Sequence, residues 1–419
     1  MTDYATIFKD MGQRARQAAN DLQAASTDVK NNLLLSIADI LETNIEVILA
    51  ANKKDMAQAD SYNLPAIMLD RLRLTEERIQ QMALGVRQLV ELADPIGEIM
   101  ESSTRPNGMK ITKVRVPLGV IAMFYEARPN VTVDAAALSL KTGNAVILRG
   151  GKEAFHSNQC LVDLIRQALI KVQLPADAVQ LVTITDRAAV SDLLRQRDYI
   201  DVVIPRGGAG LIKRIIEESR IPVIETGSGV VHVYVDKDCD ANKIVPIVIN
   251  AKVQRPSVCN SAETLLIHEA VANTYLPVIS KALFENHVEL RGDEASQKIV
   301  PAIHLAESSA WATEYNDLIM NVKVVSSVEA AINHINQYGT KHSECIITEN
   351  KEAAQLFLQQ VDASTVYVNV STRFTDGFEF GLGAEIGIST QKLHARGPMG
   401  LLALTSYKYY VTGDGQIRS

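Results

Sequence analysis

The sequence has few of the features that mark secreted, metal-binding or membrane-spanning proteins. It holds 4 cysteines in 419 residues and no Cys-x-x-Cys pair, which favours reduced thiols over a disulfide framework or a zinc site. The N-terminus lacks the basic and apolar stretches of a secretory signal. No apolar run of about eighteen residues occurs, so none could span a membrane. We therefore expect a cytoplasmic protein with no membrane contact and no metal ion.

An excess of basic charge is also absent. The 42 basic residues against 49 acidic ones give a net charge of −7, which argues against nucleic-acid binding as the main function. Three common motifs are missing: G-x-x-x-x-G-K-[ST], G-x-G-x-x-G and G-x-S-x-G. Their absence disfavours a P-loop ATPase, a standard Rossmann dehydrogenase and a serine hydrolase.

The hydrophobic periodicity changes three times along the chain. Residues 3 to about 95 repeat apolar positions at helical steps. Residues 97–116 alternate around Asn107-Gly108, a strong hairpin signal. From 116 to about 229, and again from 230 to about 370, strands and helices alternate, which predicts an α/β protein with two doubly wound parallel sheets. The chain is strand-like again after Gly397.

Strand positions follow from the apolar runs. In the first sheet we predict strands at residues 120–124, 145–148, 179–182, 202–204 and from 223 onward. In the second sheet we predict strands at residues 231–235, 264–267, 322–325, 345–348 and 366–370.

Three glycine-rich turns follow predicted strands of the first sheet. The first is Arg149-Gly150-Gly151-Lys152, the second contains Arg206-Gly207-Gly208, and the third runs from Glu225 to Gly229. The backbone N–H groups of such turns, with a helix N-terminus behind them, can bind phosphate. Because two turns carry cations and ligands bind at the carboxyl ends of parallel strands, we predict a nucleotide or phosphate site there. Ordinary tight connections are the alternative.

One cysteine lies in a polar segment. Cys259 stands between a predicted helix and a predicted strand, near Arg255 and Asn260. A nearby guanidinium lowers the pKa of a thiol and makes a nucleophile of it. The alternative is a small buried hydrophobic residue, which is our interpretation of Cys160 and Cys345.

Several short segments together resemble the γ-glutamyl phosphate reductases (glutamate-5-semialdehyde dehydrogenases), a family of the aldehyde dehydrogenase superfamily. They are VPLGV (116–120), YEARPN (125–130), KTGNA (141–145), PRGGAGL (205–211), QRPSVCN (254–260), YVN (367–369), STRFTDG (371–377), GLGAE (381–385) and HARGPMGL (394–401). The resemblance covers nearly the whole chain. It implies an aldehyde-dehydrogenase-like fold and the NADPH-dependent reduction of L-glutamyl 5-phosphate to L-glutamate 5-semialdehyde with release of phosphate, a step of proline biosynthesis. It also implies a homo-oligomer and raises the question of a transient contact with glutamate kinase.

The resemblance further implies three parts of the chain. The cofactor-binding domain would comprise residues 1–96 and 117–228, with a returning segment at about 371–398. The catalytic domain would comprise residues 229–370. Residues 97–116 and 399–419 would join in an oligomerisation flap.

Roles for catalytic residues also follow from the resemblance. The Cys259 thiolate would attack the acyl phosphate to form a thioester, which hydride from the nicotinamide would reduce. The superfamily's oxyanion-binding asparagine falls on Glu126 without gaps and on Asn130 with a short gap. We favour Asn130, because an amide donates hydrogen bonds and a carboxylate does not. Three arginines of the matching motifs are expected to bind substrate: Arg128, Arg255 and Arg373.

The superfamily's cofactor residues are matched in part. Its ribose-binding lysine falls on Arg149, and Lys152 stands where NAD-preferring relatives often have an acidic residue, so two cations favour NADP over NAD. The other expected cofactor-binding residues are Gly150, Gly151, Arg206, Gly207 and Gly208. The usual Glu-x-Phe-Gly-Pro ribose contact has no visible match.

The superfamily's general base falls on Glu225. Its carboxylate would either accept backbone N–H bonds from the Gly227–Gly229 turn or take the proton of Cys259. Two other functions remain as alternatives. One is a hydrolytic aldehyde dehydrogenase, and the other is a non-catalytic binding protein on the same fold.

Overall fold

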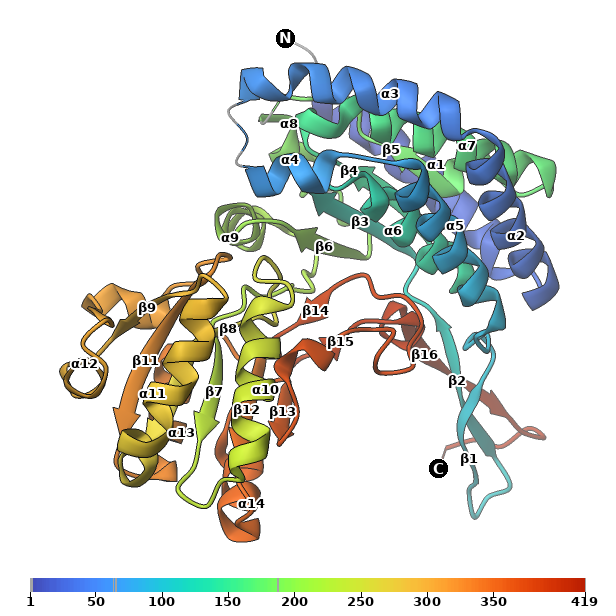
Figure 1. Ribbon diagram of the computed structural model, residues 1–419. Coiled ribbons are helices and arrows are strands. Elements are labelled where there is room, and N and C mark those ends of the chain that lie inside the picture. The colour runs from blue at the N-terminus through green and yellow to red at the C-terminus, as the bar shows by residue number, and fades with distance from the viewer. Residues whose placement is uncertain (1–2, 63, 65, 187, 419) are drawn as a thin grey trace. The chain divides into compact units, whose positions relative to one another are not determined.

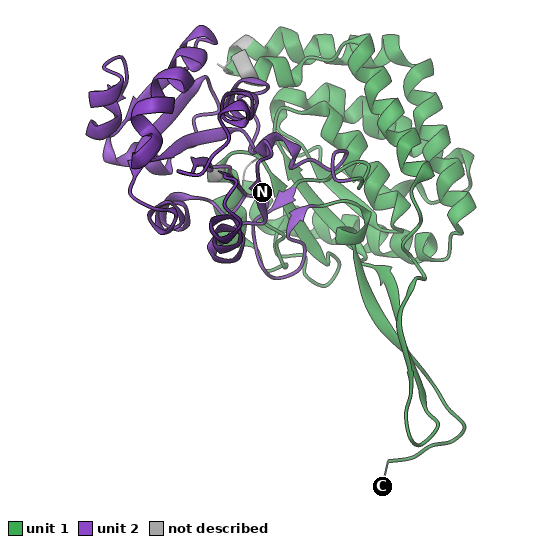
Figure 2. Ribbon diagram, turned by 60° about the horizontal axis from the view of Figure 1, so that its bottom comes forward, with its two compact units in different colours: residues 1–225, 381–387, 399–419 green, residues 226–380, 388–398 purple. Residues whose placement is uncertain are grey.

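The structure is a computed structural model that describes residues 3–62, 64, 66–186 and 188–418. The chain forms two compact units, coloured in Figure 2. Unit 1 comprises residues 1–225, 381–387 and 399–419, and unit 2 comprises residues 226–380 and 388–398. Of the segment 371–398, only residues 381–387 therefore belong to unit 1. The assignment of cofactor binding to one part and catalysis to another stays a prediction.

Unit 1 is built on a four-stranded parallel sheet (Figure 1). Its strands are β3 (Val120–Tyr125), β4 (Ala145–Arg149), β5 (Val179–Leu181) and β6 (Val202–Arg206), in the order β5-β4-β3-β6. Nearly continuous apolar runs form these strands because both faces of the sheet are covered. The order reverses at β3, with β4 on one side and β6 on the other. In open α/β sheets, a ligand-binding crevice forms at such a reversal, outside the carboxyl ends of the strands.

Helices cover both faces of this sheet, as the alternating periods predict. The helices α1 (Tyr4–Gln23), α8 (Ala188–Leu193) and α9 (Ala209–Glu218) share one apolar cluster with β3 and β4. The helices α6 (Pro129–Lys141) and α7 (Phe155–Lys171) pack on the other face (Figure 1). The outer helices α2 (Thr27–Thr43), α3 (Ile45–Gln58) and α5 (Glu76–Glu91) pack on α6 and α7, and α4 (Ala66–Leu72) packs on α3. The predicted strand from residue 223 is wrong, because only a single bridge joins Val223 to Val203.

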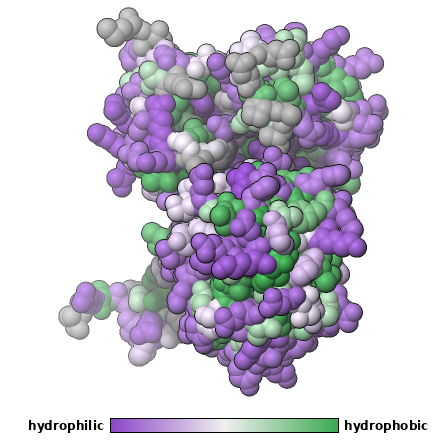
Figure 3. All heavy atoms as spheres, turned by 60° about the vertical axis from the view of Figure 1, so that its left-hand side comes forward, coloured by the Kyte–Doolittle hydropathy of each residue, from purple (hydrophilic) through white to green (hydrophobic). Residues whose placement is uncertain are grey.

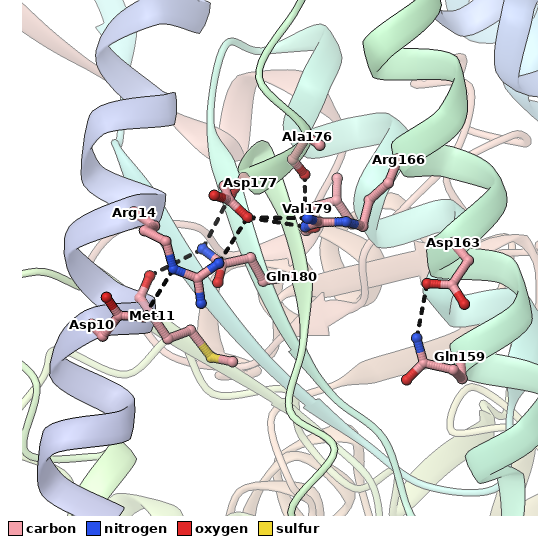
Figure 4. Close-up of polar contacts among 10 residues, drawn as sticks. All are labelled: Asp10, Met11, Arg14, Gln159, Asp163, Arg166, Ala176, Asp177, Val179 and Gln180. Carbon is pink, nitrogen blue, oxygen red and sulfur yellow. Dashed lines mark hydrogen bonds and ion pairs between the residues drawn. The ribbon is translucent and has the colours of Figure 1, made fainter.

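A carboxylate before β5 ties the two helical layers of unit 1 together (Figure 4). Asp177 accepts hydrogen bonds from Arg14 on α1 at 3.0 Å and from Arg166 on α7 at 3.2 Å. The neighbouring Gln180 donates to the Met11 carbonyl of α1 at 3.0 Å. Since one carboxylate serves both guanidinium groups, α1 and α7 are fixed relative to the start of β5.

The predicted hairpin is confirmed, and it is part of a separate three-stranded sheet in unit 1 (Figure 2). Its strands are β1 (Ile99–Thr104), β2 (Lys110–Pro117) and β16 (Thr405–Thr412), with β2 in the centre. β16 pairs with β2 from Thr405 opposite Pro117 to Thr412 opposite Lys110. All of β1 is exposed, and so is all of β16 apart from Thr405.

We predict that this three-stranded sheet makes the protein a homo-oligomer. Its exposed apolar and aromatic side chains include Ile99, Tyr407 and Tyr409, and its outer strands leave unpaired edges. Pairing with a second copy across a two-fold axis would cover both. Light scattering at micromolar concentration should therefore give at least the mass of a dimer.

A pair of truncations tests this prediction. Deletion of residues 403–419 removes β16 and should lower the mass toward that of a monomer. Deletion of residues 413–419, which follow β16, should leave the mass unchanged. A wild-type protein that runs as a monomer would contradict the prediction.

Unit 2 contains a seven-stranded parallel sheet (Figure 1). Its strands are β7 (Val231–Val235), β8 (Ala262–His268), β9 (Glu289–Gly292), β10 (His304–Leu305), β11 (Ile319–Val325), β12 (Ser343–Ile347) and β13 (Thr365–Val368), in the order β10-β9-β11-β8-β7-β12-β13. The five predicted strands are confirmed, whereas β9 and β10 were not predicted. A short pair, β14 (Ile388–Ser389) and β15 (Gly397–Pro398), also belongs to this unit.

Two apolar clusters cover the faces of the seven-stranded sheet. One contains Val233 and Val235 with side chains of α10 (Ala241–Val253) and α11 (Glu269–Glu285). The other contains Tyr234 with side chains of α13 (Val328–Tyr338) and α14 (Lys351–Gln360). This alternation along β7 is that of a strand buried on both faces.

Neither the drawn surface nor the helices show membrane features in the described part of the chain. On the face drawn in Figure 3, hydrophobic side chains lie in separate patches among hydrophilic ones. None of the helices in the described part of the chain has both the length and the apolar character needed to cross a bilayer.

Candidate active site

The half-buried Cys259 lies in the segment that joins α10 to β8. Gly229 precedes β7, the strand next to β8, so both residues lie at the amino ends of neighbouring strands. A Cβ atom on Gly229 would stand 1.5 Å from the Cys259 carbonyl oxygen. The two backbones are therefore in direct contact, and only glycine fits at position 229.

Glu314 holds the other side of Gly229. Its Oε1 accepts the Gly229 N–H at 2.8 Å. Two residues later, the Asn316 N–H donates to Oε1 of Glu263 at 3.3 Å. The segment that contains Glu314 and Asn316 leads into β11, the other neighbour of β8. Three connections thus meet at one end of the sheet and fix the backbone around Cys259.

A buried ion pair brackets the cysteine segment. Lys252, in the last turn of α10, lies 2.8 Å from Glu263, the second residue of β8, and both side chains are almost fully buried. Burial raises the pKa of Glu263 to about 7 although the Lys252 cation opposes this shift. Burial also lowers the pKa of Lys252. Removing one partner of such a pair typically costs about 3–5 kcal/mol, so the pair anchors both ends of the segment.

Two predicted substrate-binding arginines lie near Cys259. Arg373 donates from Nε to Gln254 Oε1 at 2.8 Å, and its guanidinium also hydrogen-bonds the Asn260 side chain. Burial lowers the pKa of Arg373, the Arg255 charge lowers it further, and the Cys259 thiolate opposes both. The structure therefore brings two cations, Arg255 and Arg373, together with the thiol of Cys259 within unit 2.

Burial makes the thiols of the other three cysteines less reactive than a free thiol. Cys345 is fully buried in β12, and burial raises the pKa of its thiol to about 12. Burial also raises the pKa of Cys160 on α7 and of Cys239. Since the thiolate is the reactive form, these shifts disfavour reaction at all three positions.

The two basic glycine turns follow β4 and β6, which lie on either side of β3 in unit 1, and a carboxylate of the chain contacts each turn. After β6, the Gly208 N–H donates to Oε2 of Glu126 at 2.8 Å. After β4, the Glu153 carboxylate packs against Gly151 and accepts the Ala127 N–H at 2.7 Å. Neither contact could be predicted from the sequence. Glu126 and Gly208 are 82 residues apart, and Ala127 and Glu153 are 26 residues apart.

The predicted cofactor cations surround the same strand ends. Arg149 and Arg206 are the last residues of β4 and β6, and both are half-buried. Lys152 is exposed, with its Nζ 4.6 Å from the centre of the Tyr62 ring. This cation–π contact holds the ammonium group at the edge of unit 1.

The residues after β3 begin helix α6. Arg128 precedes the helix and is half-buried, and Asn130 is exposed in its first turn. The Asn130 amide donates to Oδ2 of Asp134 at 3.1 Å. Burial raises the pKa of Asp134 to about 6, while the Asn130 hydrogen bond and the Arg206 charge lower it. One amide hydrogen of Asn130 is thus used, and the amide carries a second one.

Glu225 ends the first segment of unit 1 and is half-buried. The Gly227 N–H donates to the Ile388 carbonyl at 3.3 Å, and the Gly229 N–H donates to Glu314. These two glycine N–H groups thus have acceptors in unit 2, and the role of Glu225 stays a prediction. Within the described residues, no three His, Cys, Asp or Glu side chains are grouped so that they could hold a metal ion.

Comparison with known proteins is consistent with this arrangement. Residues 5–315 match the model of the aldehyde dehydrogenase family. The γ-glutamyl phosphate reductases of Moorella thermoacetica and Lacticaseibacillus paracasei are 58% and 59% identical to the chain, over 97% and 99% of both sequences. The crystal structure of the Thermotoga maritima γ-glutamyl phosphate reductase superposes with a TM-score of 0.95 at 46% identity, covering 98% of this chain and 100% of that one.

The fold and the family model thus define an aldehyde-dehydrogenase-like oxidoreductase. The chain belongs, within that family, to the γ-glutamyl phosphate reductases.

Proposed function

We propose that this protein reduces L-glutamyl 5-phosphate to L-glutamate 5-semialdehyde with NADPH and releases phosphate, as a step of proline biosynthesis. The observation that carries the proposal is the hydrogen bond from Arg373 to the side chain of Asn260, the residue after Cys259, in a chain 58% identical to a γ-glutamyl phosphate reductase. A cytoplasmic location and a transient contact with glutamate kinase belong to the same proposal.

Cys259 begins the proposed reaction. Its thiolate attacks the acyl phosphate carbonyl, the bond to phosphate breaks, and a thioester on Cys259 remains. Arg255 and Arg373 attract the anionic substrate and stabilise the charge of the departing phosphate. Splitting one difficult step into two easier ones is the advantage of the covalent route.

The oxyanion formed at the carbonyl needs hydrogen-bond donors. The Cys259 backbone N–H is one proposed donor, and the second amide hydrogen of Asn130 is the other. A donor of this kind contributes about 3 kcal/mol to the transition state. We assign Glu225 an accessory role rather than that of the base that ionises Cys259.

The residues at the carboxyl ends of β3, β4 and β6 fit a dinucleotide. Gly151 and Gly207 carry no side chain, so a ligand that displaces the neighbouring Glu153 and Glu126 carboxylates can approach the backbone there. Arg149, Lys152 and Arg206 supply positive charge. The bound cofactor supplies a hydride for the thioester carbon. Collapse of the resulting hemithioacetal then releases the aldehyde and restores the Cys259 thiolate.

The reverse reaction distinguishes the candidate functions. With glutamate 5-semialdehyde, the protein should reduce NADP only when inorganic phosphate is present. A hydrolytic aldehyde dehydrogenase would need no phosphate, and a non-catalytic binding protein would give no reduction at all. Either result would refute the proposal.

We predict that Arg149 and Lys152 select NADPH over NADH. A charge-assisted contact to the 2′-phosphate contributes about 1.5–3 kcal/mol. Replacing both residues with alanine should therefore raise the KM for NADPH about tenfold or more and barely change the KM for NADH. Lys213→Ala, which removes a cation from α9, is the control and should change neither value. Equal effects on the two cofactors would show that these cations do not contact the 2′-phosphate.

A further inference from the structure

Glu126 lies where the strand order of unit 1 reverses. It follows β3 directly, and its carboxylate reaches the turn after the neighbouring strand β6. There its Oε2 accepts the N–H of Gly208, the N-cap residue of α9, at 2.8 Å. A Cβ on Gly207 would stand 2.6 Å from the same oxygen. The carboxylate therefore fills the space that the missing side chain leaves.

This position is also the place where the sheet favours an anionic ligand. The first N–H groups of a helix have no partner within it, and the helix dipole adds partial positive charge. A phosphate group bound there would use the Gly208 N–H, which now donates to Glu126. Two anions held at one helix terminus repel each other, so phosphate and the carboxylate compete.

We propose that Glu126 is an internal competitor for the cofactor: its carboxylate occupies the α9 N-terminus in the free protein, and a nucleotide phosphate displaces it. This inference rests on the proposed function for the identity of the nucleotide. It makes Glu126 a determinant of cofactor affinity. Because the competition acts on phosphates common to the reduced and oxidised cofactor, it weakens both and favours their exchange after each reaction.

The backbone beside Glu126 confines this change to its side chain. Ala127 has a φ of +29°, and its N–H is held by Glu153. A fixed bend follows Glu126 directly. We therefore expect the carboxylate to leave by rotation of side-chain bonds, while the segment that leads to Arg128 and Asn130 stays in place.

Binding measurements on variants test the proposal without the catalysed reaction. Dissociation constants are measured for NADPH by its fluorescence and for ADP, adenosine and inorganic phosphate by calorimetry. Glu126→Ala should lower the dissociation constants of NADPH and ADP about tenfold, which is the ratio expected for one charge-assisted hydrogen bond. Adenosine, which has no phosphate, should bind unchanged. Glu126→Gln keeps the hydrogen-bond acceptor but not the charge, so it should lower both dissociation constants by less than Glu126→Ala does.

A matched control separates local competition from overall charge. Glu218 lies at the other end of α9, where it pairs with Arg214 at 2.7 Å and Ser191 at 2.6 Å. Glu218→Gln removes the same charge and should leave nucleotide affinity within about twofold, as expected of an exposed pair. Thermal unfolding checks each variant, and Glu126→Gln carries the test if the alanine variant does not fold.

Several results would overturn the inference. The first is unchanged or weaker binding of ADP and NADPH by folded Glu126 variants. The second is an equal gain in nucleotide affinity in Glu218→Gln. The third is a Glu126 variant that binds inorganic phosphate more tightly but not ADP or NADPH. Failure of the proposed function looks different. In that case the wild-type protein shows no phosphate-dependent reduction of NADP, whereas the effect of Glu126 on ADP binding persists.

Discussion

Replacing Cys259 with serine should abolish reduction of the acyl phosphate while leaving the fold intact. Cys259 is half-buried, lies near Arg255 and Arg373, and is the proposed site of the thioester. A serine hydroxyl has a similar size but is almost fully protonated at neutral pH, so it is a much weaker nucleophile. We expect the rate to fall about 10²-fold or more, as for other missing catalytic groups.

Cys160→Ser is the matched control, because Cys160 is a half-buried cysteine on α7 whose thiol pKa is raised by burial. It should keep the wild-type rate. Alkylation with one equivalent of iodoacetamide, followed by peptide mapping, should modify Cys259 before the other three cysteines. The thioester mechanism would be wrong if Cys259→Ser retained more than about a tenth of the wild-type rate. Loss of a catalytic group is expected to leave about a hundredth or less.

The elements with clear periodicity were predictable from the sequence, and those that depend on neighbours were not. The strand β7 is a run of buried residues, and the hairpin of β1 and β2 has Asn107-Gly108 at its turn. By contrast, β9 reads Glu-Leu-Arg-Gly, a composition that does not favour a strand. It forms because β11 and β10 pair with it on both sides. At Val223 and Ile224 the reverse holds: both residues favour a strand, but Val223 makes only a single bridge, to Val203.

The candidate site divides in the same way. Arg255 and Cys259 are close in sequence, so their proximity could be predicted, and Arg373 was found through the family motif. The contact of Glu314 with Gly229 joins residues 85 apart in the sequence, and no local pattern indicates it. The carboxylates of Glu126 and Glu153 in the glycine turns likewise depend on tertiary structure.

Gly229→Ala should have an effect nearly as large as loss of the thiol, although residue 229 carries no functional group. The added Cβ would stand 1.5 Å from the Cys259 carbonyl oxygen and 2.8 Å from its Cα, so one backbone must move. The neighbouring contacts oppose such a movement, because Glu314 holds the Gly229 N–H and the Lys252–Glu263 pair anchors the cysteine segment. A displacement of about 1 Å at a reacting group can cost about 10²-fold in rate.

We therefore expect Gly229→Ala to fold, to lose about 10²-fold in kcat by that misplacement, and to change the alkylation rate of Cys259. Gly85→Ala is the matched control, because a Cβ at Gly85 on α5 meets no atom within 4 Å. Alanine also favours a helix over glycine by about 1 kcal/mol, so this control should keep its activity and unfold at a slightly higher temperature. A Gly229→Ala variant with wild-type rates of both reduction and alkylation would show that the backbone contact does not position Cys259. If only the alkylation rate stayed unchanged, the thiol would be in place, and the loss would arise at the Cys259 N–H, the proposed donor to the oxyanion.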